Sequence, residues 1–331
     1  MRLARYFGGG DVRIVEEPEP DLPPGGLLVR TEACGLCSGE LMAWYMDRKV
    51  PHVLGHEVSG VVLASDDPRF PVGRRVFPHH HAPCLECAEC RAGRHVHCRQ
   101  WRATKLVPGG MAERFAVPSA NLNDTRVAEN LRPVDAALIE PLACVVKAIR
   151  RSGRFVRPEG FGGFAPAEGE KVAVVGLGSM GLMHLLAARR SAYGIDLNPA
   201  RIEWAKSRGL DARTPEAAEP ADIVFVCPGT GPALDTAVRV AKPGGCIVLF
   251  APFPPGTPPS PDWDRVYFQD LSLVSSYSCG PDDTAVAHEL LADRIVRAED
   301  VISHFIDFDE LPNAYRAMRA GDILKAMVVF S

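Results

Sequence analysis

Four cysteines lie close together in the first third of the chain, at the spacing C-x2-C-x2-C-x7-C: Cys84, Cys87, Cys90 and Cys98. Four thiolates at such short spacing can close around one tetrahedral Zn²⁺ and leave no open coordination position, and closed all-sulfur sites are structural. Disulfides are the other use of clustered cysteines, but they are rare where glutathione keeps thiols reduced. The spacing therefore predicts a structural zinc lobe at about residues 79–100.

Five histidines share this stretch: His79, His80, His81, His95 and His97. Because four sulfurs already complete a tetrahedral coordination sphere, the lobe needs no histidine ligand. We expect these side chains at the surface or in packing contacts, with His79–His81 lining a cleft as the alternative.

A second motif with chemical meaning is Gly176-x-Gly178-x-x-Gly181, which lies between the apolar run KVAVVG and the helix-like stretch SMGLMHLLAARR. Its glycines allow a tight turn, a close approach to a pyrophosphate and close helix–strand packing. Asp196 follows twenty residues after Gly176 and ends the next predicted strand, where a carboxylate binds ribose hydroxyls and repels a 2′-phosphate. The motif predicts a dinucleotide site that prefers NAD over NADP.

The elements around these motifs indicate two kinds of domain. Residues 1–62 alternate short strand-like runs with Pro/Gly turns and are predicted to be all-β, and PVDAALIEPLACVVKAIRR at 133–151 is predicted to be a helix. From residue 171 onward, strands alternate with helices, which indicates a parallel sheet covered by helices. The length of 331 residues also favours two domains over one.

Composition excludes several classes of protein. The net charge of −4 argues against a nucleic-acid binder, and no apolar run is long enough to span a bilayer. The N-terminus has no apolar signal core, so we expect a cytoplasmic protein that does not bind membranes.

A third set of residues could hold a catalytic metal. Cys37 lies in ACGLCSGE, His56 and Glu57 lie in VLGHEVSG, and Glu140 lies in ALIEPLACVVKA. A Cys/His/Glu set with an open fourth position suits a Lewis-acid zinc, which polarises a carbonyl or lowers the pKa of a bound alcohol or water.

Together these motifs resemble those of the zinc-dependent medium-chain alcohol dehydrogenases, with closest similarity to the polyol (sorbitol) and threonine dehydrogenase branch. The resemblance extends over essentially the whole length. It implies that Cys37 and His56 bind the catalytic zinc and that Glu57 binds or approaches it. It also implies that Glu140 is the third ligand, at the position where classical members place a cysteine and this branch places a glutamate. It also implies that NAD binds at the glycine-rich turn and the following strand, with contacts from Gly176, Gly178, Met180, Gly181 and Asp196.

The resemblance further implies an α/β fold in which a Rossmann domain is inserted into a GroES-like, β-rich catalytic domain. The expected boundaries are 1–141 for the catalytic domain, 142–276 for the Rossmann domain and 277–331 for the C-terminal return. The expected activity is hydride transfer between NAD and a secondary alcohol or polyol, with a ketone as product. Two zinc ions per chain and a homodimer or homotetramer are expected.

Two positions depart from the family pattern. The hydroxyl expected two residues after Cys37 is replaced by Gly39, with Ser38 beside it, and a histidine often found five residues after Cys37 is replaced by Met42. Glu40 stands where an aspartate is usual and is expected to orient His56. Met42, Trp44, Tyr45 and Met46 are candidates for the substrate wall, with core packing as the alternative.

Two other functions compete with this interpretation. One is a zinc-free quinone oxidoreductase of the same superfamily, which the presence of Cys37, His56 and Glu140 disfavours. The other is a non-catalytic zinc-ribbon binding protein, which the acidic charge and the glycine-rich turn disfavour.

Overall fold

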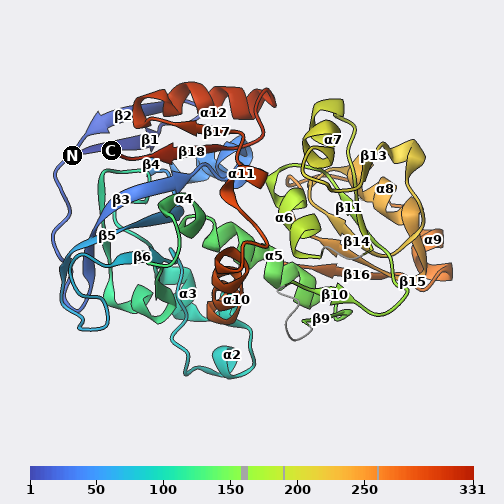
Figure 1. Cartoon of the computed structure of the whole chain (residues 1–331), viewed down its shortest axis with the longest axis horizontal. Coiled ribbons are helices and arrows are strands. Elements are labelled where there is room, and N and C mark those ends of the chain that lie inside the picture. The colour runs from blue at the N-terminus through green and yellow to red at the C-terminus, as the bar shows by residue number, and fades with distance from the viewer. Residues whose placement is uncertain (158–162, 189–190, 259–260) are drawn as a thin grey trace. The chain divides into compact units, whose positions relative to one another are not determined.

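The computed structural model describes residues 1–157, 163–188, 191–258 and 261–331, which divide into two units (Figure 1). The first unit comprises Met1–Ala143, Cys279–Ala292 and Ile302–Ser331, and the second comprises Cys144–Ser278 and Asp293–Val301. In these described ranges, no helix has the length and apolar character needed to cross a membrane.

The larger sheet of the first unit has the strand order β17-β18-β3-β5-β6-β8, and β7 also pairs with β3. All of its pairs are antiparallel except β17 with β18. Its strands are β3 (Leu27–Gly35), β5 (Glu57–Ser65), β6 (Arg75–Pro78), β7 (Arg114–Val117), β8 (Thr125–Val127), β17 (His304–Ile306) and β18 (Ala326–Val329). The pairing of β18 with β3 brings the C-terminal segment to the strand that precedes Cys37.

A smaller antiparallel sheet of the first unit has the order β2-β1-β4, with β1 (Arg2–Tyr6), β2 (Val12–Glu16) and β4 (His52–Val53). The hydrophobic core of the first unit includes Tyr6, Phe115 and Tyr315, which are almost fully buried. The helices of this unit are α1 (Ala43–Met46), α2 (Ala88–Arg91), α3 (Arg99–Ala103), α4 (Pro133–Ala136), α10 (Pro281–Ala292) and α12 (Leu311–Ala320), with 3₁₀ turns η1 (Ser38–Leu41), η2 (Asp47–Lys49), η3 (His95–His97), η4 (Ser119–Asp124) and η6 (Phe308–Glu310).

Two sequence-based predictions for this unit need correction. Residues 1–62 are not all-β, because the segment 38–49 forms η1, α1 and η2. The predicted helix at 133–151 is divided into α4 and α5 (Ile139–Arg151). Pro141 has no N–H to donate to the carbonyl of Ala137, so the helical hydrogen-bond ladder is interrupted at this point.

The second unit contains a parallel sheet in the order β13-β12-β11-β14-β15-β16, the arrangement of a dinucleotide-binding fold. Its strands are β11 (Val172–Val175), β12 (Ala192–Ile195), β13 (Ala212–Arg213), β14 (Ala221–Val226), β15 (Ala241–Leu249) and β16 (Ser272–Ser275). The central strand β11 is buried along its whole length, which explains its continuous apolar sequence. The predicted parallel sheet is confirmed.

The remaining elements of the second unit are the short antiparallel pair β9 (Phe155–Val156) and β10 (Ala165–Pro166), the helices α6 (Ser179–Ala187), α7 (Pro199–Lys206), α8 (Gly231–Val240), α9 (Trp263–Phe268) and α11 (Ala298–Val301), and the turn η5 (Pro215–Ala217). The boundary between the units falls within α5.

The C-terminal return begins at Cys279 instead of the expected residue 277, and it is interrupted by one segment. Residues Asp293–Val301 belong to the second unit, not to the first. There Trp204 Nε1 donates a hydrogen bond to the carbonyl of Asp300 (3.0 Å), and Arg208 donates to the carbonyl of Glu299 (3.1 Å). These contacts join α11 to the C-terminal end of α7, and no local sequence pattern predicts them.

Candidate active site

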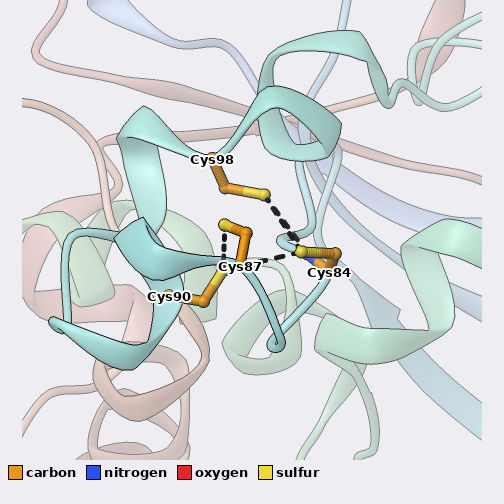
Figure 2. Close-up of side chains that lie close together, drawn as sticks. All are labelled: Cys84, Cys87, Cys90 and Cys98. Carbon is orange, nitrogen blue, oxygen red and sulfur yellow. Dashed lines mark hydrogen bonds between the residues drawn. The ribbon is translucent and has the colours of Figure 1, made fainter.

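The four cysteines of the lobe converge as their spacing predicts (Figure 2). Their Sγ atoms lie 3.5 Å apart for Cys87 and Cys90, 3.6 Å for Cys84 and Cys98, and 3.9 Å for Cys84 and Cys90. Sulfurs at the corners of a tetrahedral zinc site, each at about 2.3 Å from the ion, are about 3.8 Å apart. The four side chains therefore already have the separations that a structural zinc requires.

Two of the lobe cysteines ionise unequally: burial and a hydrogen bond with Cys87 raise the pKa of Cys90 to about 12, whereas the surroundings of Cys98 favour its thiolate form. The backbone N–H of Cys84 donates to Cys98 Sγ at 3.4 Å. Burial opposes the ionisation of Cys98, but the N–H groups of Cys84 and Trp101 lower its pKa to about 6. Thiolates are the form of cysteine that binds zinc, and Cys90 and Cys98 are buried with Trp101 in a small core of their own.

A second convergence joins Cys37, His56 and Glu57, whose ligand atoms all lie within 4.8 Å of one another. Cys37 follows the end of β3, and Glu57 is the first residue of β5. The two strands pair antiparallel with Gly35 opposite Glu57, so the register itself brings the two motifs together. Gly35 also provides space, because a Cβ there would lie 2.2 Å from Glu57 Oε2.

Glu40 holds His56 in place, in the position that the sequence analysis expected for it. Glu40 Oε1 lies 3.2 Å from His56 Nδ1 and accepts the backbone N–H of Gly55 at 2.7 Å. Burial raises the pKa of the Glu40 carboxyl, but His56 and the Gly55 N–H together lower it below its usual value. Burial likewise opposes protonation of His56, but Cys37 and Glu40 raise its pKa well above the ordinary range.

Lys325 completes this group and was not anticipated from the sequence. Its ammonium is fully buried, lies 2.6 Å from Glu57 Oε2 and 2.9 Å from Oε1, and donates to the carbonyl of Leu36 at 3.0 Å. Lys325 immediately precedes β18, and the β18–β3 pairing delivers it. Burial lowers the pKa of Lys325, but Glu57 raises it above its usual value, so the ammonium stays protonated. The Glu57 carboxylate thus forms a buried ion pair with Lys325.

Glu140 lies in a different group from the one expected. Its carboxylate is within 4.8 Å of ligand atoms of His79 and Cys279, in a set that does not include Cys37. Burial raises the pKa of the Glu140 carboxyl above its usual value, although the neighbouring His56 and His79 oppose this shift. Spacing along the chain could not distinguish these two environments.

The histidines that precede the lobe are not surface residues. His79 is completely buried, and the ring of His80 lies between those of His56 and His79, with centroids 4.8 and 5.0 Å away. His81 packs on Trp101 at 4.2 Å. The expected packing contacts are confirmed for His79, His80 and His81.

The four candidate substrate-wall residues after Cys37 differ in burial. Met46 is buried in the core of the first unit, so packing is its role. Tyr45 is exposed, and Met42 and Trp44 are half-buried. Ser38 is also exposed, and η1 begins at this residue.

In the second unit, the glycine-rich turn has the form of a phosphate cradle. Gly176 has a φ of +91°, and a Cβ on Gly181 would lie 1.9 Å from the Gly176 carbonyl oxygen, so neither position accepts a side chain. At Gly178, the N-cap of α6, a Cβ would meet nothing within 4 Å, which leaves room for a ligand at the helix N-terminus. Met180 is half-buried in the first turn of α6.

Asp196 lies beside this turn at the end of β12. Its carboxylate accepts the backbone N–H of Leu177 at 2.6 Å and that of Asn198 at 2.8 Å. The side chain of Arg201 is 3.7 Å from the same carboxylate. The described residues therefore fit a nicotinamide dinucleotide at this turn, with the Asp196 carboxylate beside it.

Comparisons with known proteins agree with these observations. Residues 23–126 match the alcohol dehydrogenase GroES-like domain, and residues 175–293 match the zinc-binding dehydrogenase domain. The chain is 31% identical to D-altritol 5-dehydrogenase of Agrobacterium fabrum, with 94% of each chain covered, and 26% identical to L-threonine 3-dehydrogenase of Rhizobium johnstonii, with 94% of this chain and 93% of that protein covered.

Solved structures show the same fold. A zinc-binding dehydrogenase from Sinorhizobium meliloti 1021, solved with NADP bound, superposes with a TM-score of 0.83 at 24% identity over 99% of this chain and 98% of that one. The resemblance predicted from the motifs is confirmed, and so is the combination of a GroES-like with a Rossmann domain. The chain belongs to the zinc-binding medium-chain alcohol dehydrogenases, in the branch that contains threonine and polyol dehydrogenases.

Proposed function

We propose that the chain is an NAD-dependent zinc dehydrogenase that interconverts a secondary alcohol, in particular a polyol, and the corresponding ketone. The observation that carries the proposal is the convergence of Cys37, His56 and Glu57, oriented by Glu40, in a chain of this family. The relatives named for threonine and D-altritol support a substrate with a hydroxyl on a secondary carbon.

In this proposal, the first unit provides the catalytic and structural metal sites and the second unit binds the nucleotide. Cys37 and His56 would hold the catalytic zinc, with Glu57 and Glu140 as the neighbouring carboxylates, and Cys84, Cys87, Cys90 and Cys98 would hold the structural zinc. We further propose that the protein is a cytoplasmic homodimer or homotetramer.

The chain's own residues prepare this site for alcohol oxidation. When bound, the zinc supplies a Lewis acid for the substrate oxygen and the nicotinamide supplies a hydride acceptor. Glu40 orients the His56 ring, and the Glu57–Lys325 pair places a fixed charge pair beside the metal ligands. The hydroxyl proton of the substrate must reach solvent, and Gly39 offers no side chain for this step.

A substrate screen tests the proposal. NAD reduction should be measured with polyols, hydroxy amino acids and short secondary alcohols. At least one class should be oxidised by the wild type, and the activity should disappear on chelation and return with Zn²⁺. Activity that survives complete zinc removal would contradict it and favour a zinc-free reductase.

Ser38→Ala should keep kcat/KM within about tenfold of the wild type across the pH profile. Ser38 is exposed, and a shift of one residue from the usual hydroxyl position changes the direction of the side chain. We therefore expect water, or a second hydroxyl of the substrate, to carry the proton. A positioned acid–base group contributes about 10²–10⁴-fold, so a loss of a hundredfold or more at unchanged zinc content would identify Ser38 as the relay.

The wild type should prefer NAD over NADP by at least about tenfold in kcat/KM, or about 1.4 kcal/mol. Asp196→Asn should reduce this preference, because it removes the negative charge but keeps an oxygen that can accept the Leu177 N–H. Arg201→Ala is the matched control. Equal kcat/KM for both cofactors in the wild type would refute the assignment, and a selective loss of NADP activity in Arg201→Ala would assign a 2′-phosphate contact to that residue.

A further inference from the structure

Three side chains from distant parts of the first unit meet in a group that shares no residue with the Cys37 group or with the four lobe cysteines. His79 follows β6, Glu140 lies in the first turn of α5, and Cys279 precedes α10. One ligand atom from each lies within 4.8 Å of the other two, and all three residues are buried, with exposed fractions of 0%, 5% and 0%. We refer to them as the buried His–Glu–Cys trio.

The separation of two of these atoms matches a metal site. His79 Nε2 lies 3.6 Å from Cys279 Sγ. A nitrogen at about 2.0–2.1 Å and a sulfur at about 2.3 Å from a tetrahedral zinc are about 3.6 Å apart. The pair therefore already spans one edge of a zinc tetrahedron without any movement.

The orientation of His79 is held from its other side. Asp124 Oδ2 lies 2.7 Å from His79 Nδ1, and Asp124 Oδ1 accepts the hydroxyl of Thr284 at 2.6 Å. A carboxylate accepts a hydrogen bond from Nδ1–H, so the lone pair of the ring is left on Nε2, which faces Cys279. A carboxylate behind an imidazole in this way is the usual support of a metal-binding histidine.

The donor types also select the ion. An imidazole nitrogen, a sulfur and a carboxylate oxygen are the three ligand types that zinc uses in proteins, whereas magnesium and calcium require oxygen ligands. Three protein ligands leave a fourth tetrahedral position open.

We propose that His79, Glu140 and Cys279 bind a further divalent transition-metal ion, zinc first, in addition to the ions of the Cys37 group and the lobe. His80 lies between the Cys37 group and the trio: its ring centroid is 4.8 Å from that of His56 and 5.0 Å from that of His79. The proposal does not depend on dehydrogenase activity.

Metal content of the purified full-length chain tests this site. The chain is stripped with a chelator, reloaded with Zn²⁺ or Co²⁺ and desalted, and bound metal is measured by mass spectrometry. Cys279→Ala should hold one equivalent less than Cys34→Ala, the matched control. Cys34 is a buried cysteine of the same unit that belongs to none of the three groups.

A spectroscopic measurement supports the count. In the Co²⁺-loaded protein, Cys279→Ala should lose part of the thiolate-to-cobalt charge-transfer absorption that Cys34→Ala retains. His79→Gln serves in place of Cys279→Ala if that variant does not fold, judged by circular dichroism, and should also lose one equivalent. Equal metal content and equal absorption in the trio variant and the control would overturn the site and leave only a Cys–His hydrogen bond. If one equivalent is lost but no alcohol supports NAD reduction, the proposed function fails and the metal site stands.

Discussion

Cys37→Ser should lose one equivalent of zinc and at least about a thousandfold in kcat/KM, or about 4 kcal/mol of transition-state stabilisation, while the lobe keeps its metal. Serine is a poor zinc ligand at neutral pH. Without the Cys37 thiolate, His56 and the carboxylates would bind zinc with low affinity. The substrate oxygen would then lack its Lewis acid. Zinc content and steady-state rates of the same preparations measure both effects.

Cys34→Ala provides the control for this variant. Cys34 lies three residues earlier, in β3, and is fully buried, but it belongs to no group of candidate ligands. It should keep the wild-type zinc content and lose less than about tenfold in rate. A Cys37→Ser protein that retains both its zinc and its rate would show that the metal does not bind at this residue.

Cys90→Ser should lose the structural zinc and destabilise the protein by about 3 kcal/mol or more, which corresponds to a fall in Tm of roughly 6–12 °C. The lobe contains only short helices and a four-residue core around Trp101, so its fold depends on the metal. Calorimetry and metal analysis on the same sample test the two effects together.

His97→Ala is the matched control within the lobe. His97 is exposed and its ring nitrogen faces Arg102, 3.3 Å away. It should leave both zinc content and Tm unchanged. If His97→Ala loses a metal equivalent, a histidine belongs to the ligand set of the lobe; if Cys90→Ser keeps its zinc and its Tm, the lobe is not a zinc site.

Local patterns in the sequence were sufficient for the features whose parts are close together in the chain. The apolar run at 172–175 and the helix that follows predicted β11 and α6, because a buried parallel strand needs apolar residues on both faces. The lobe cysteines converge because the short helix α2 and the turn η3 fold the chain back between them. In the 176–181 turn, Gly176 has a positive φ and Gly181 has no space for a Cβ, so both positions require glycine.

Where local patterns failed, hydrogen bonding and strand pairing explain the failure. The break between α4 and α5 follows from the missing N–H of Pro141, which an apolar pattern does not register. The segment Asp293–Val301 belongs to the second unit because of hydrogen bonds from Trp204 and Arg208, almost a hundred residues away.

The amino-acid sequence alone determined which chemistry the chain can perform, because ligand types, their short spacings and the glycine-rich turn are local properties. Only the tertiary structure decided which carboxylate lies in which group. The β18–β3 pairing brings Lys325 to Glu57, which lies 268 positions earlier in the chain. Cys279, just before α10, contacts His79, which lies 200 positions earlier. Contacts at such separations depend on strand order and register, which local spacing does not encode, and they place Glu140 beside His79 and Cys279.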